Sequence, residues 1–112
     1  MSCATAPSRL SDPTLFKTQA YINGAWVDAS DGASFAVDNP ADGTLVARVA
    51  DVEPAQAEAA IAAAQAAFGP WRARTAKDRA ALLRRWFELM LAHADDLAAL
   101  MTLEQGKPLA EA

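Results

Sequence analysis

Residues 101–112 read MTLEQGKPLAEA, and this segment carries the clearest structural signal in the chain. At its centre, Gly106-Lys107-Pro108 is typical of a boundary between two helices. Glycine suits the left-handed position after a helix end, and proline suits a first helical turn. The residues after Pro108 are Leu, Ala, Glu and Ala, which favour helix, and no cap, glycine or proline follows them. The sequence therefore predicts a helix that begins near Pro108 and is not completed at Ala112.

Two longer helical segments precede this boundary. From Pro54 to Phe68, nine of fifteen residues are alanine, the strongest helix former, and Gly69-Pro70 is expected to end the helix. Thr75-Ala76-Lys77-Asp78 resembles a capping box with Asp in place of Glu, so a second helix is expected to begin there. Its apolar residues follow a period of 3.6 up to His93, where a bend is predicted before the helix that ends at Gly106.

The first half of the chain predicts short strands. Asn23-Gly24, between apolar β-formers, is a strong hairpin signal because both turn positions need positive φ. Residues 34–38 and 44–49 are expected to be extended, with a turn at residues 39–43 between them. A small β meander followed by three to four helices indicates the α/β class. Because so narrow a meander cannot cover the apolar helix faces, the sequence predicts an incomplete fold whose partner is missing.

Composition limits the possible functions. The net charge is -4 and the pI is about 4.8, which argues against a dedicated nucleic-acid binder. Six basic residues lie between residues 72 and 85, and they are interpreted as a solvated helix face. Residues 1–14 are expected to be a flexible leader without the apolar core of a signal peptide, and no apolar run is long enough to span a membrane. With a single cysteine, Cys3, the chain is expected to be cytoplasmic.

No catalytic constellation is found in the sequence. One His (His93) and one Cys (Cys3) exclude a zinc site of the usual ligand spacing. The five glycines are too far apart for a phosphate-binding loop. Asp95 and Asp96 are adjacent, and neighbours on a helix point in different directions, so they are not expected to act as a catalytic pair. The sequence predicts no catalytic and no cofactor-binding residue in this chain.

Several segments resemble the aldehyde dehydrogenase superfamily, and the last of them is most similar to its succinate-semialdehyde branch. The resemblance covers about residues 15–112. The segments that carry it are QAYINGAW (19–26), NPADG (39–43), the alanine-rich helix to Phe68 with Trp71, TAKDR (75–79), LRRWF (83–87) and MTLEQGKPLAEA (101–112).

This resemblance implies that residues 15–112 are the N-terminal portion of an NAD(P)-binding domain, truncated at Ala112. The parent would be an NAD- or NADP-dependent succinate-semialdehyde dehydrogenase of 4-aminobutyrate breakdown, several-fold longer than this chain. It is expected to be a homo-oligomer that takes a small aldehyde and binds neither nucleic acid nor membrane. Its catalytic cysteine, glutamate and nucleotide loop would all lie beyond Ala112, so the chain alone is expected to be inactive.

The resemblance also implies one candidate metal site. Some members of the superfamily hold an alkali cation with main-chain carbonyls before the Asn-Pro turn and with an acidic side chain before Gly-Lys-Pro. The matching residues are Val37, Asp38 and Glu104, and hard oxygen ligands suit such an ion. The alternative is that Glu104 simply caps or pairs near a helix end.

Two other functions remain open from the sequence. The chain is equally compatible with a dehydrogenase for glutarate semialdehyde or another aldehyde, because relatives acting on glutarate semialdehyde share much of this region. It is also compatible with a non-enzymatic helical module whose apolar face binds a partner protein.

Overall fold

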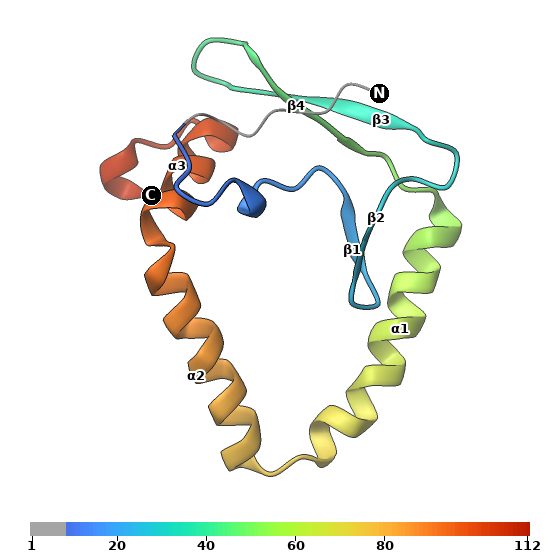
Figure 1. Ribbon diagram of the computed structural model, residues 1–112. Helices are drawn as coiled ribbons and strands as arrows, with labels where there is room; N and C mark the ends of the chain where they lie inside the picture. The colour runs from blue at the N-terminus through green and yellow to red at the C-terminus, as the bar shows by residue number, and fades with distance from the viewer. Residues whose placement is uncertain (1–8) are drawn as a thin grey trace.

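The computed structural model describes residues 9–112, in which four short strands precede three α-helices (Figure 1). The strands are β1 (Ala20–Ile22), β2 (Ala25–Val27), β3 (Ser34–Asp38) and β4 (Leu45–Ala50). The helices are α1 (Pro54–Ala73), α2 (Ala76–Ala92) and α3 (Ala94–Gln105). Short 3₁₀ turns, η1 (Pro13–Leu15) and η2 (Leu109–Glu111), lie near the two ends of this region.

The strands form two separate antiparallel ribbons. In the first, Tyr21 pairs with Trp26 across the predicted Asn23-Gly24 turn, where φ is 50° and 79°. Both values are positive, as a two-residue hairpin requires, so this prediction is confirmed. In the second ribbon β3 pairs with β4, and the register shifts between Val37 and Asp38. The ribbons are joined where the Ala50 amide donates to the Thr18 carbonyl at 2.8 Å.

Helix α1 begins as the sequence predicts but ends later. Pro54 occupies its first turn, and the Gln56 side chain accepts a hydrogen bond from the Glu53 amide at 3.3 Å. Gly69-Pro70 was expected to end the helix, yet α1 runs on to Ala73, so that prediction was wrong. A proline removes one helical hydrogen bond, and this cost is limited because only three more residues follow in the last turn.

The boundaries of α2 and α3 confirm the sequence signals. The Thr75 hydroxyl oxygen accepts a hydrogen bond from the Asp78 amide at 3.1 Å and caps the start of α2. His93 ends α2 and precedes α3, which is the predicted bend. Gly106 ends α3 in the left-handed conformation with φ 77°. After Pro108 the chain forms the 3₁₀ turn η2 rather than an α-helical turn.

The described residues contain very little core. Ala29 and Ala47 are the buried apolar residues, and no large side chain is fully buried within residues 9–112. Instead, the Gln56 side chain near the start of α1 holds the loop after β2. It accepts a hydrogen bond from the Ser30 amide at 2.9 Å and donates one to the Asp28 carbonyl at 3.1 Å. These bonds enclose Ala29 against the start of α1. Within residues 9–112, no helix is both long and apolar enough to cross a membrane.

Gly106 is where the end of α3 meets the turn after β3. A Cβ at this position would lie 2.9 Å from Cγ of Pro40, and its φ of 77° is unfavourable for any residue with a side chain. We therefore expect Gly106→Ala to lower the free energy of unfolding by about 1–3 kcal/mol. Urea unfolding followed by far-ultraviolet circular dichroism measures this change.

Gly69→Ala is the matched control. Gly69 lies inside α1, and apart from its chain neighbours and the nearby helix backbone no atom lies within 4 Å of the added methyl group. Alanine favours a helix interior over glycine by about 0.8–1 kcal/mol, and crowding against Pro70 offsets part of this gain, so the variant should be at least as stable as the unsubstituted chain. Equal effects of the two substitutions would contradict the role assigned to Gly106.

Candidate functional site

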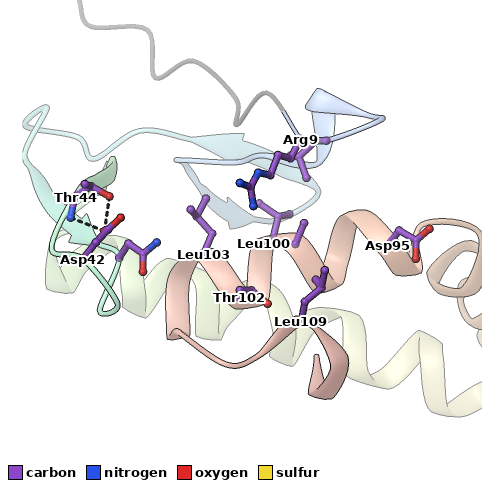
Figure 2. Close-up of a pocket in the computed structure, with 11 residues that line it drawn as sticks. Arg9, Asp42, Thr44, Asp95, Leu100, Thr102, Leu103 and Leu109 are labelled. Atoms are coloured by element: carbon purple, nitrogen blue, oxygen red, sulfur yellow. Dashed lines mark hydrogen bonds between the residues drawn. The ribbon is translucent and has the colours of Figure 1, made fainter.

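A hollow in the described region lies between the β3–β4 turn, α3 and the segment that precedes η1 (Figure 2). Its volume is about 680 Å³. Arg9 lies close to Leu100 and Leu103 on its wall, while Asp42 and Thr44 come from the turn after β3. The lining residues are Arg9, Leu10, Asn39, Asp42, Thr44, Asp95, Ala99, Leu100, Thr102, Leu103 and Leu109.

The polar groups of this hollow serve structure rather than chemistry. Asp42 Oδ1 accepts hydrogen bonds from the amide of Thr44 at 3.0 Å and from its hydroxyl at 2.7 Å. These bonds, the amide bond first, lower the pKa of Asp42 below its ordinary value, so the carboxylate stays ionised and holds the turn. Thr102 Oγ1 is buried without a hydrogen-bond partner. The Thr44 hydroxyl is therefore held within the turn by Asp42, and no His or Cys is among the lining residues.

A second, smaller hollow of about 330 Å³ surrounds a buried carboxylate at the start of α3. Asp96 is 4% exposed, and its two oxygens accept hydrogen bonds from the amides of Ser11 and Asp12, each at 2.8 Å. Asp12 in turn caps η1 by accepting from the Thr14 amide and hydroxyl. Asp96 therefore anchors the start of the described chain to α3.

Hydrogen bonding sets the ionisation of Asp96. The amide of Ser11, then that of Asp12, lowers the pKa of Asp96 below its ordinary value of 3.8, and nearby His93 acts in the same direction. Burial and the charge of Asp12 oppose this shift. A carboxyl group whose pKa is lowered in the folded state stabilises that state above its unfolded pKa. This contribution to stability begins to be lost as the pH falls below about 4, the pKa of the carboxyl group in the unfolded chain. The loss continues as the pH falls through the lower pKa of Asp96 in the folded chain.

The three predicted cation ligands lie on two segments that the fold brings together. Val37 and Asp38 end β3 at the register shift, where the regular strand pairing is interrupted. Glu104 is exposed in the last turn of α3, two residues before Gly106. The close approach of Gly106 to Pro40 sets the end of α3 against the turn after β3. The cation site itself remains a prediction.

Sequence reasoning missed the role of Asp96. From the sequence, the adjacent Asp95 and Asp96 are considered only as a catalytic pair, which is rejected. In the structure Asp95 is exposed whereas Asp96 is buried. Acidic residues in a first helical turn point to a dipole or capping role, but the partners of Asp96 lie more than eighty residues away in sequence. Cys3 lies outside the described residues, and within residues 9–112 no three or more His, Cys, Asp and Glu side chains are grouped so that they could hold a metal ion.

These features define a structural segment of an α/β protein, and the comparisons show which class it comes from. The model of the aldehyde dehydrogenase family matches residues 26–112. The chain belongs to this family.

The particular relatives act on different aldehydes according to their names. A 3-sulfolactaldehyde dehydrogenase of Pseudomonas putida is 56% identical over 92% of this chain and 21% of its own length. A glutarate-semialdehyde dehydrogenase of Pseudomonas aeruginosa and an NADP-dependent succinate-semialdehyde dehydrogenase of Escherichia coli are each 55% identical, over 93% of this chain and 22% of their own lengths.

A solved structure confirms the fold. Succinate-semialdehyde dehydrogenase from Burkholderia pseudomallei matches with a TM-score of 0.89 at 51% identity, over 93% of this chain and 22% of that chain. The chain thus spans about a fifth of the length of the relatives it matches. The expected incomplete, amino-terminal part of an aldehyde dehydrogenase fold is confirmed by this match.

Asp96→Asn tests the anchor. An amide side chain retains one acceptor oxygen, so one of the two amide bonds is lost and the start of the chain is held less firmly. We expect faster hydrogen exchange at the Ser11 and Asp12 amides, with helix content unchanged. In the wild-type chain the same two amides should lose protection as the pH falls below about 4, once intrinsic exchange rates are corrected for.

Asp95→Asn is the matched control because Asp95 is adjacent and exposed. It should leave protection at Ser11 and Asp12 unchanged. Faster exchange in both variants would show that net charge, rather than the hydrogen bonds, holds this segment.

Proposed function

We propose that this chain is the amino-terminal part of an NAD(P)-dependent dehydrogenase that oxidises succinate semialdehyde to succinate in the breakdown of 4-aminobutyrate. The observation that carries the proposal is the match to the succinate-semialdehyde dehydrogenase of Burkholderia pseudomallei, at a TM-score of 0.89 and 51% identity. The 55% identity to the Escherichia coli enzyme supports it. The proposed enzyme is a cytoplasmic homo-oligomer that uses NAD or NADP.

In this proposal residues 15–112 form the outer part of the cofactor-binding domain and residues 1–14 are a leader. The chain contributes a scaffold rather than reacting groups. Two of its carboxylates, those of Asp42 and Asp96, are occupied by main-chain amides. The catalytic cysteine and its partners belong to the remaining four fifths of the polypeptide, so the 112-residue chain is inactive by itself.

Two alternative substrates have direct support. Glutarate semialdehyde and 3-sulfolactaldehyde are the substrates in the names of relatives that are 55% and 56% identical to this chain. All three candidates are short aldehydes with a terminal anionic group, so the coarser proposal is an enzyme for small acidic aldehydes. The exposed apolar faces also keep a non-enzymatic interaction module as a second candidate function.

Turnover assays on the longer polypeptide that contains this chain test the substrate. Each of the three aldehydes is offered with NAD and with NADP, and reduced nicotinamide is followed by its absorbance. We expect the highest kcat/KM for succinate semialdehyde and no turnover by the 112-residue chain alone. A higher kcat/KM for another aldehyde would reassign the substrate, and no turnover of any aldehyde would favour the interaction module.

We also propose that Val37, Asp38 and Glu104 hold an alkali cation. The interrupted pairing at Val37 and Asp38 and the approach of Gly106 to Pro40 support this site. In the longer polypeptide, potassium should raise the unfolding temperature, and Glu104→Gln should remove most of this dependence because a carboxylate attracts the ion more strongly than an amide.

Glu111→Gln serves as the control for Glu104→Gln, since it changes the net charge equally and lies in the exposed η2 turn. It should keep the potassium dependence. An unfolding temperature that does not respond to potassium in the unsubstituted protein would rule out the site.

A further inference from the structure

We propose that the apolar face of α2 is a docking surface for the remaining polypeptide of the dehydrogenase. This inference rests on the proposed function, since it assumes that the chain is part of a longer enzyme. We call the surface the α2 face and define it by large apolar side chains that are 43–62% exposed: Leu82, Leu83, Trp86, Phe87, Leu89, Met90 and Leu91.

The α2 face is too broad for an ordinary surface helix. At about 100° per residue, its side chains cover roughly 200° of the circumference of α2. A helix at the surface of a globular protein needs an apolar stripe of only about 100°. The opposite side carries Arg84 and Glu88, whose exposed side chains form an ion pair at 3.1 Å. One side of α2 is therefore suited to solvent, and the rest is suited to contacts with more than one neighbour.

Within residues 9–112, the other elements leave the α2 face uncovered. In Figure 1, α1 and α2 diverge from the turn that joins them, so they do not cover each other along their lengths. The β3–β4 ribbon lies near the other ends of the helices, and the β1–β2 ribbon lies beside α1 rather than α2 (Figure 1). On α1, Ile61, Phe68 and Trp71 are 68%, 55% and 37% exposed and add to the apolar surface.

The size of the uncovered surface indicates a large and permanent partner. The chain has an accessible surface of 8416 Å², whereas a compact protein of 11.8 kDa has about 5,900 Å². Its radius of gyration is 16.7 Å, against about 13 Å for a compact domain of this length. An excess of about 2,500 Å² on this side of a contact corresponds to about 5,000 Å² over both partners, which is the size of obligate interfaces rather than transient ones.

The occupant is the rest of the same polypeptide rather than a second copy of this segment. The same fold occurs, at a TM-score of 0.89, inside a Burkholderia pseudomallei chain of which it makes up 22%. Most of that polypeptide is therefore available to pack on the segment. A two-fold contact with a second copy presents α2 with one neighbour across the axis, which leaves much of a 200° arc exposed.

Comparing one substitution in two settings tests the proposal. Trp86→Glu is made in the 112-residue chain and in a chimera, in which this chain replaces the matched segment of the Burkholderia pseudomallei enzyme. Trp86 is 62% exposed and glutamate favours helix, so the isolated chain should keep its helix content. In the chimera the same change puts a charge into a buried contact. Its unfolding temperature should fall by about 6 °C or more.

Arg85→Glu is the matched control, because Arg85 lies on the solvent side of α2 and is exposed. It should alter the unfolding temperature of the chimera by no more than about 2 °C. Hydrogen exchange adds a second readout: the amides of α2 should be more protected in the chimera than in the 112-residue chain.

Several results would overturn the proposal. An unfolding temperature of the chimera that is insensitive to Trp86→Glu would show that the α2 face stays open. A 112-residue chain that dimerises, with Trp86→Glu abolishing the dimer and leaving the chimera unaffected, would identify a second copy as the occupant. A chimera that does not fold, beside a parent enzyme that does, would show that the face does not fit the family's remaining polypeptide. These readouts are independent of turnover, so a wrong substrate assignment leaves the docking result unchanged.

Discussion

The buried carboxylate of Asp96 is the interaction on which the arrangement of the described chain most depends. It accepts two main-chain amides at 2.8 Å from residues more than eighty positions earlier, and so joins the start of the chain to α3. A buried carboxylate is costly unless it is hydrogen bonded, and both oxygens of Asp96 are. Because each oxygen of Asp96 accepts from one main-chain amide, the two hydrogen bonds fix how Ser11 and Asp12 are positioned on α3 as well as their closeness to it.

Two further contacts, one polar and one of close packing, complete this framework. Gln56 at the start of α1 fastens the loop after β2, and the close approach of Gly106 to Pro40 sets the end of α3 against the second ribbon. Apolar burial normally supplies most of the stability of a domain. Here the buried apolar residues are two alanines, while the large apolar side chains of α2 remain exposed. Within residues 9–112, directional contacts therefore define the shape, and the apolar surface points outward to a partner.

Local signals in the sequence predicted the local structure well. The Asn23-Gly24 turn, the Thr75 cap and the left-handed Gly106 each depend on the conformational needs of one or two residues. The end of α1 was misjudged, because a glycine and a proline in the last turn cost too little to stop a helix that packing or propensity otherwise favours. The division of the strands into two ribbons reflects long-range pairing, which short strands do not encode.

The candidate site was predictable only in part. The excess of apolar helix surface could be inferred from residues 82–91, because the 3.6-residue period places each apolar residue on the helix circumference without knowledge of the fold. The anchor at Asp96 could not, since its partners are main-chain amides that carry no sequence signature. Resemblance to the aldehyde dehydrogenases supplied the class, and the match over residues 26–112 confirmed it.

The distribution of identity among the relatives bears on where substrate choice is made. Enzymes named for 3-sulfolactaldehyde, glutarate semialdehyde and succinate semialdehyde are 56%, 55% and 55% identical to this chain. A segment that selected the aldehyde would be expected to resemble one of them more than the others, because rejecting a related substrate requires different side chains against it. Near-equal identity to all three enzymes fits a segment whose residues support the fold rather than select the aldehyde. The carboxylates of Asp42 and Asp96 hold main-chain amides, and the apolar face of α2 is suited to protein rather than to a small acidic molecule. In the proposed enzyme, substrate selection is therefore expected to lie outside this segment.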